Sequence, residues 1–241
     1  PVAGDAAVQG QRLRFEARRQ WLEAAGAQGL EQPMPSDNFG PRDPDRAAQQ
    51  SDATREGERL LEGVNLIVLS ASATQTAMES FVRTEHRGQA THFIIDYNGD
   101  IYQSLDLMLR ASHSGIASVD ERSISVTLVN PFKADQPPLP AGTKGLRRPL
   151  SERSELHDRV LRAWGYTTPQ KVSLARLLKD LSRHLGGLEL TIPPETHGLT
   201  TTLPAADLTT VKGVIGGHHV NSALDGPAVS YTHLTLPTME L

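Results

Sequence analysis

Histidines lie at the ends of apolar runs or beside glycine in three stretches of the chain. His92 lies near the start of THFIIDYNGDIYQ, His113 lies in RASHSG, and GGHHVNSALDGP carries His218, His219 and Asp225. An imidazole binds metal ions and moves protons near neutral pH. The chain has no cysteine, so a metal ion must be held by histidine, carboxylate or water. Three such stretches in one chain suggest a site.

The composition limits the classes of partner. A chain of 241 residues has room for one sizeable domain with appendages. The hydrophobic share is 38% and the mean hydropathy is -0.35, values typical of a soluble protein, and no apolar run is long enough for a transmembrane segment. The net charge is -4 with both signs interspersed, which argues against a nucleic-acid partner.

Three regions are expected along the chain. Residues 1–57 combine an amphipathic helix, near 7–28, with a disordered linker rich in Pro, Asp, Gln and Arg. Residues 58–228 contain the clearest apolar runs and form the expected domain. Residues 229–241 fit nothing before them and look like a translated sequencing adapter, so we interpret them as a non-native tail.

The first half of the domain predicts strand, helix, hairpin and strand in that order. A strand is expected in VNLIVLSAS, and a helix in QTAMESFVRTEHRG, which Gly88 ends. The Asn98-Gly99 pair between two apolar runs predicts a tight hairpin turn. SISVTLVN follows as a strand, and its weak alternation predicts burial on both faces.

The second half begins with residues 130–151, whose prolines and glycines predict a long surface loop. A helix follows in TTPQKVSLARLLKDLSRHLGG, with Thr168 as its cap and Pro169 at its first position. Its expected apolar face consists of Val172, Leu174, Leu177, Leu178, Leu181 and Leu185. Last comes a strand, GVIGG, that runs into a loop carrying His218, His219 and Asp225.

In this order the stretches resemble the zinc-dependent N-acetylmuramoyl-L-alanine amidase family over roughly residues 60–228. The resemblance lies in LIVLSASAT, THFIIDYNGDIYQ, ASHSG before SISVTLVN, TTPQKVSLARLLKDL and GHHVNSALDGP. It implies an α/β fold, with a central mixed β-sheet flanked by helices, and peptidoglycan or a muropeptide as partner. It also implies a cell-envelope or secreted protein. In that family a zinc-activated water cleaves the amide between muramic acid and L-alanine.

The resemblance places two metal ligands at His218 and Asp225 and the first ligand at Ser70. A serine hydroxyl is a poor neutral ligand for zinc compared with an imidazole, so the expected zinc site is degenerate. Other histidines are alternative replacements for the missing ligand: His219, His86 and His197.

The resemblance also implies three candidate substrate-binding residues. Thr91 and His92 fall at the mouth of the cleft, and His113 falls in a loop that lines the substrate groove. For His92 the alternative, which we favour, is a structural histidine beside the site. For His113 the alternative is a loop histidine that hydrogen-bonds to the backbone.

Three functions follow from these residues. The first is an amidase that hydrolyses the muramoyl-L-alanine bond with metal-activated water, provided that a metal site is intact. The second is a module of the same fold that binds muropeptides without cleaving them. The third is an assembly component whose domain only docks another protein. Catalytic residues are not assigned, and metal binding separates the first two functions.

Overall fold

The computed structural model describes residues 39–41, 63–131, 137–156, 159–186, 188–196 and 201–222. The predicted helix near 7–28, the predicted tail 229–241, His197 and Asp225 lie outside the described residues. Within the predicted linker, Phe39–Pro41 forms strand β1, which pairs antiparallel with β5 (Leu109–Ala111). The structure differs from the predicted linker at these three residues, because main-chain pairing requires no apolar periodicity.

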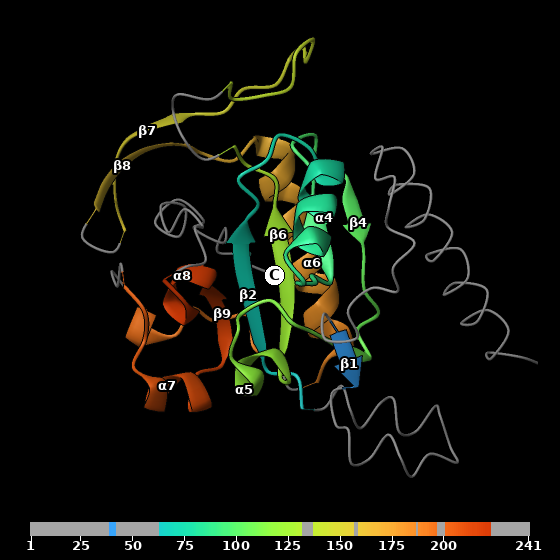
Figure 1. The fold of residues 1–241 in the computed structure, drawn as a ribbon, viewed down its shortest axis with the longest axis vertical. Helices are drawn as coiled ribbons and strands as arrows, with labels where there is room; N and C mark the ends of the chain where they lie inside the picture. Colours follow the sequence, from blue (N-terminus) through green and yellow to red (C-terminus); the bar gives the residue numbers. More distant parts are fainter. Residues whose placement is uncertain are drawn as a thin grey trace, which may run out of the picture.

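A five-stranded mixed sheet forms the centre of the domain (Figure 1). Its order is β4-β3-β6-β2-β9, with bounds β2 Leu66–Ala71, β3 Phe93–Ile95, β4 Ile101–Gln103, β6 Ser123–Leu128 and β9 Gly213–Gly216. β3, β6, β2 and β9 run parallel, and β4 is antiparallel to β3. The predicted α/β fold with a central mixed sheet is therefore confirmed.

The β3–β4 hairpin turns at Asn98-Gly99, as the sequence predicted. Gly99 has a φ of +91°, a conformation that favours glycine. A Cβ atom at Gly99 would lie 2.9 Å from the carbonyl oxygen of Pro169, at the start of the long helix. The turn therefore requires glycine both for its backbone conformation and for close packing against that helix.

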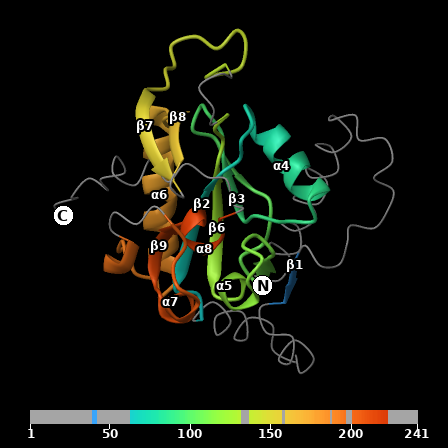
Figure 2. The ribbon, with the colours of Figure 1, turned by 60° about the vertical axis from the view of Figure 1, so that its left-hand side comes forward.

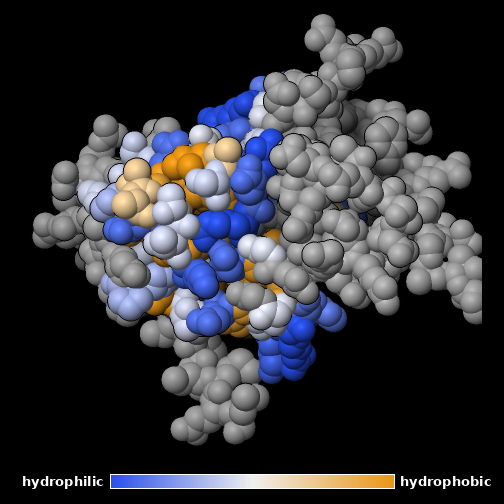
Figure 3. All heavy atoms as spheres, turned by 90° about the horizontal axis from the view of Figure 1, so that it is seen from below, coloured by the Kyte–Doolittle hydropathy of each residue, from blue (hydrophilic) through white to orange (hydrophobic). Residues whose placement is uncertain are grey.

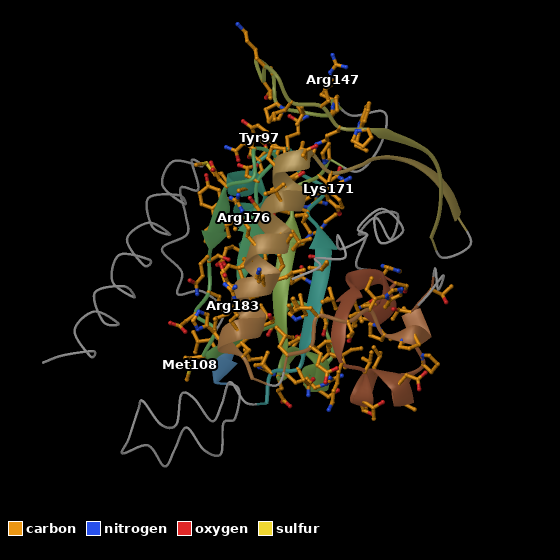
Figure 4. The ribbon with its side chains drawn as sticks, turned by 180° about the vertical axis from the view of Figure 1, so that it is seen from behind. Tyr97, Met108, Arg147, Lys171, Arg176 and Arg183 are labelled. Carbon is orange, nitrogen blue, oxygen red and sulfur yellow. The ribbon has the colours of Figure 1, made fainter. Side chains whose placement is uncertain are left out.

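Helices cover both faces of the sheet. α6 (Thr168–His184) packs on one face, where its leucines meet Ile67, Ile124 and Val126 (Figure 4). The shorter helices contribute to the clusters on the other face: α4 (Ala77–His86), α5 (Ala117–Asp120), α7 (Ala205–Thr210) and α8 (Gly217–Val220). A 3-10 turn, η1, spans Pro194–Thr196. Of the shorter helices, only α4 was predicted.

The long helix α6 departs from its prediction in its cap, in the position of Pro169 and in two residues of its faces. Its cap is Thr167 rather than Thr168, because the Thr167 side chain accepts a hydrogen bond from the Gln170 N–H in a capping box. Pro169 is therefore at the second helical position rather than the first. Val172, predicted on the apolar face, is 44% exposed. Gln170 is fully buried instead and donates to the carbonyl oxygens of Val129 and Ile95. The amide side chain thus ties the helix to the ends of two strands.

The segment before α6 ends in a hairpin that the sequence did not predict. β7 (Leu150–Leu156) pairs antiparallel with β8 (Arg159–Trp164), and this ribbon extends beyond the sheet (Figure 2). Just before it, the buried Arg148 donates to the carbonyl oxygens of Val129 and Gly165 at 2.8 and 3.1 Å. Burial lowers the pKa of Arg148 to about 10. This side chain anchors the long loop to the body of the domain.

The underside of the described domain carries mixed hydrophilic and hydrophobic side chains (Figure 3). Within the part of the chain that the structure describes, no helix has the length and hydrophobicity needed to cross a membrane.

Candidate functional site

A row of hydroxyl groups crosses the sheet near the carboxyl ends of β2 and β6. Ser70 and Thr127 are direct partners in the parallel register, and their hydroxyl oxygens lie 3.1 Å apart. Thr127 Oγ1 donates to Thr91 Oγ1 at 3.1 Å, and Thr91 Oγ1 lies 3.0 Å from Ser125 Oγ. We call Ser70, Thr91, Ser125 and Thr127 the hydroxyl row. Because a hydroxyl both donates and accepts, the row offers a ligand either kind of hydrogen bond.

Alternation along the strands explains why these hydroxyls share a face. In β6, Ile124 and Val126 pack in the cluster beneath α6, so Ser125 and Thr127 point to the opposite face. Ser70 lies on that same opposite face, because it continues the alternation of Leu66 and Val68 in β2. The sheet is therefore apolar toward α6 and partly polar on the other side.

The hydroxyl row forms one side of a cavity of about 230 Å³. The remaining walls come from the turn after β2, from α4 and the residue that follows it, from the segment before β3 and from the His113 loop after β5. The lining residues are Ser70, Ala71, Ser72, Ala73, Arg83, Thr84, Arg87, Gln89, Ala90, Thr91, His113, Ser125 and Thr127. None of these lining residues is Asp or Glu, whereas two are arginines. The cavity therefore combines hydroxyl groups with positive charge.

His92 is fully buried and is not among the residues that line the cavity. Its Nδ1 accepts from the Ser125 N–H at 3.0 Å, and its Nε2 lies 3.0 Å from the Leu109 carbonyl oxygen. An Nδ1 that accepts and an Nε2 that donates correspond to the neutral imidazole with its proton on Nε2. The side chain therefore links β6 to β5 behind the hydroxyl row.

His113 lines the cavity and is 8% exposed. Its Nε2 lies 2.8 Å from Ser123 Oγ and 3.4 Å from Asp120 Oδ1. Asp120 also accepts from the N–H and hydroxyl of Ser114, at 3.0 and 2.6 Å. This polar cluster holds the RASHSG loop against the sheet. Thr91, the third predicted substrate-binding residue, lines the cavity as part of the hydroxyl row.

His218 lies in the one-turn helix α8 rather than in the predicted loop, and it is 2% exposed. The ring centroids of His218 and His219 are 3.8 Å apart, and His219 Nδ1 accepts from the Gly216 N–H. Leu69 pairs with Gly216, so Ser70 and α8 both follow the same edge of the sheet. The predicted first and second ligand positions thus share the carboxyl edge, and Asp225 lies outside the described residues.

The described residues do not fit a zinc site with three protein ligands. Ser70 offers a neutral hydroxyl that is hydrogen-bonded to Thr127, not an imidazole or carboxylate. Across the described ranges, no three His, Cys, Asp or Glu side chains are grouped so that they could hold a metal ion. Among the alternative ligands, His86 is exposed in the last turn of α4. The described residues around Ser70 therefore form a polar cavity rather than a zinc site with three protein ligands.

Comparison with known protein families shows to which family the chain belongs. A profile of the N-acetylmuramoyl-L-alanine amidase family, Amidase_2, matches residues 61–226, well over half of the chain. The chain belongs to this family. Amidases of this family act on peptidoglycan and are generally zinc-dependent. The predicted membership of the amidase family is thereby confirmed. Among curated protein sequences, no significant match was found.

Solved amidase structures are similar at low identity. AmiD from E. coli, bound to anhydro-N-acetylmuramic acid-L-Ala-D-γ-Glu-L-Lys, is 16% identical over 55% of this chain and 46% of its own, with a TM-score of 0.38. AmpDh3 from Pseudomonas aeruginosa, bound to an anhydromuramic pentapeptide, is 15% identical over 64% of this chain and 51% of its own, with a TM-score of 0.39. A selenomethionine derivative of AmpD is 16% identical over 82% of this chain and 88% of its own, with a TM-score of 0.40. The chain spans about half the length of AmiD and AmpDh3.

The sequence analysis missed most of the cavity wall. Ser125 and Thr127 were treated only as part of a buried strand, and Arg83 and Arg87 only as part of a helix. A signal for the hydroxyls exists in SISVTL, where small polar residues alternate with Ile, Val and Leu. This alternation distinguishes a face with polar side chains from one packed against α6. The arginines carried no comparable local signal.

Proposed function

We propose that this domain binds peptidoglycan fragments in the cavity beside the hydroxyl row and does not hydrolyse them. The observation that supports this proposal is the Ser70–Thr127 hydrogen bond at the position of the expected first zinc ligand. A muropeptide has sugar hydroxyl and acetamido groups and a peptide that ends in a carboxylate. Hydroxyl, amide and guanidinium side chains suit the recognition of such groups.

Hydrolysis requires more than the hydroxyl, amide and guanidinium side chains of the cavity. In the family, three protein ligands hold the metal ion that activates the attacking water. A nearby side chain must also stabilise the oxyanion and deliver a proton to the leaving amine. Among the described lining residues, His113 is the candidate for delivering this proton. Its Nε2 is already within hydrogen-bond distance of Ser123 Oγ. We therefore assign no catalytic step to these residues.

The predicted site residues take distinct roles in this proposal. Thr91 and His113 contact the ligand, because both line the cavity. His92 acts as a positioning residue for β5 and β6, through its two ring nitrogens. His218 and Asp225 would be the remaining ligands if the domain binds zinc. A cell-envelope location follows from the proposed ligand.

The test measures binding and cleavage on the same samples. The full chain is titrated calorimetrically with N-acetylmuramoyl-L-Ala-D-γ-Glu-L-Lys, once with EDTA and once with added zinc. We expect the same dissociation constant in both buffers, and mass spectrometry should detect only intact ligand. Zinc-dependent release of the free tripeptide would contradict the proposal and identify an amidase. Absence of binding in both buffers would also contradict it.

A further inference from the structure

We propose that the cavity recognises a carboxylate of its ligand through Arg83, assisted by Arg87. We call these two residues the arginine pair. This inference rests on the proposed function and deepens it, because it names the ligand group that the cavity selects. Both arginines line the same cavity as the hydroxyl row, and both come from the last part of α4 or the residue that follows it.

Arg83 is oriented by an unusual turn. Its Nη1 donates to the carbonyl oxygen of Ala73 at 3.0 Å. Ala73 has a φ of 55°, in the left-handed region that residues other than glycine rarely adopt. Such a conformation persists only where the surroundings enforce it, and it is concentrated at functional sites. Both residues line the cavity, so the strained turn and the guanidinium group belong to the same wall.

The turn around Ala73 is held by its neighbours. Ser72 Oγ lies 2.6 Å from Thr74 Oγ1 and accepts from the Thr74 N–H at 3.2 Å. Ser72 Oγ also accepts from the Asn130 N–H at 3.3 Å, just after β6. These contacts fix the carbonyl group of Ala73 and therefore one end of the guanidinium group. A guanidinium group held at one nitrogen loses less freedom when it binds a ligand.

The charge balance of the wall favours an anionic group. A guanidinium group pairs well with a carboxylate, because both are planar and can form two parallel hydrogen bonds. None of the described lining residues is acidic. Glu79, one turn before Arg83, accepts from the Gln75 N–H at 2.9 Å at the start of α4 and does not line this cavity. The arginine pair thus shares the cavity with hydroxyl groups, and no carboxylate of the described cavity wall competes for it.

A neutral-sugar site is the competing explanation, because hydroxyl groups alone recognise sugars. Two ligands that differ only in having carboxylates or neutral carboxamides on the glutamate separate the two explanations. The first is N-acetylmuramoyl-L-alanyl-D-glutamate, and the second is its diamide, in which both glutamate carboxylates are carboxamides. The two ligands have nearly the same size and the same sugar, so a difference in affinity reports on the carboxylates.

Calorimetric titration of the full chain with both ligands tests the inference. We expect the diacid to bind about tenfold more tightly than the diamide, as for a charged hydrogen bond in a partly exposed site. Arg83→Gln should remove most of that preference, and Arg83→Gln combined with Arg87→Gln should remove all of it. Arg83→Lys, which keeps the charge, should retain part of it. Higher salt should reduce the preference in the wild type.

Arg176→Gln is the matched control, because Arg176 is an exposed arginine of α6, on the far side of the sheet (Figure 4). It removes the same charge and should leave the preference unchanged, and circular dichroism establishes that each variant is folded. Equal binding of both ligands by the wild type would overturn the carboxylate inference and leave the proposed function standing. Binding of neither ligand would contradict the proposed function itself, and a preference unaffected by both arginine substitutions would overturn the role of the arginine pair.

Discussion

The main-chain N–H of Ser125 donates a hydrogen bond to Nδ1 of His92 over 3.0 Å, inside the central sheet. The other ring nitrogen of His92 lies 3.0 Å from the carbonyl oxygen of Leu109 in β5. One buried side chain thus connects a central strand with the β5 strand that leads to the His113 loop. Buried polar groups of this kind stabilise a structure only while all their partners are present.

Replacing His92 by alanine should therefore destabilise the domain strongly. The change leaves the Ser125 N–H and the Leu109 carbonyl oxygen without their partners and creates a cavity. We expect the free energy of unfolding to fall by about 2–4 kcal/mol, measured by urea denaturation. His86→Ala, at an exposed position of α4, should change it by less than about 0.5 kcal/mol. Equal effects of the two substitutions would show that the His92 contacts contribute little.

Neighbouring arginines before β7 should differ sharply in their effect on stability. Arg148 is 6% exposed and donates to three acceptors, whereas Arg147 is exposed (Figure 4). Arg148→Met removes three hydrogen bonds donated by a buried side chain, so it should lower the free energy of unfolding by about 2–4 kcal/mol. Arg147→Met removes the same charge and should change it by less than about 0.5 kcal/mol. Thermal denaturation that ranks the two variants in the opposite order would contradict this account of the loop anchor.

The strained turn at Ala73 predicts a stabilising substitution. A left-handed conformation costs an alanine about 1–2 kcal/mol relative to glycine. Ala73→Gly should therefore raise the free energy of unfolding by about 0.5–1 kcal/mol, since glycine also gives the unfolded chain more freedom. Ala175→Gly, in the interior of α6, should instead lower it by about 1 kcal/mol. Denaturant titration of both variants gives the sign of the change in free energy of unfolding. A loss of stability in Ala73→Gly would contradict the inference that Ala73 is strained.

Asp96 predicts a dependence of stability on pH. Burial raises the pKa of the Asp96 carboxyl group above its ordinary value of 3.8, and hydrogen bonds from the Tyr97 and Ala77 N–H groups offset part of this. The folded protein therefore holds this proton more tightly than the unfolded chain does. The resulting stability is fully present below pH 3.8 and is lost as the pH rises through the folded-state pKa.

The variant Asp96→Asn cannot ionise and should therefore gain stability relative to the wild type as the pH rises. Urea denaturation between about pH 4 and pH 8 measures the difference in free energy of unfolding. Asp180→Asn, on the exposed face of α6, should show a much smaller trend. A difference between Asp96→Asn and wild type that is constant, or that falls with pH, would refute the effect of burial.

Ser70→His tests the position of the expected zinc ligand. An imidazole there should raise the bound zinc toward about one ion per chain, if His218 and Asp225 are correctly placed. Zinc content after dialysis, measured by atomic absorption, provides the readout. Ser70→Ala is the matched control and should bind no more zinc than the wild type. No gain of zinc in Ser70→His would mean that Ser70 is not at the position of the first zinc ligand.

Much of the fold was predictable because local patterns report local structure. The apolar run at 64–72 became β2, the Asn98-Gly99 turn became the β3–β4 hairpin, and the leucines after Pro169 became the buried face of α6. The N-cap of α6 and the exposure of Val172 were not predicted correctly, since helix phase and capping depend on contacts with Gln170 and neighbouring strands. The β7–β8 hairpin was missed altogether.

The sequence by itself determined the order of the main strands and helices, the Asn98-Gly99 turn and the family resemblance. Only the tertiary structure decided which polar side chains meet. Ser70 and Thr127 are 57 residues apart, and they become neighbours because β2 and β6 pair in one parallel register. Arg83 lines the same cavity because α4 packs against β3 on that side of the sheet. Register and packing are non-local, so no pattern within one stretch could have shown that hydroxyl groups and arginines share a cavity.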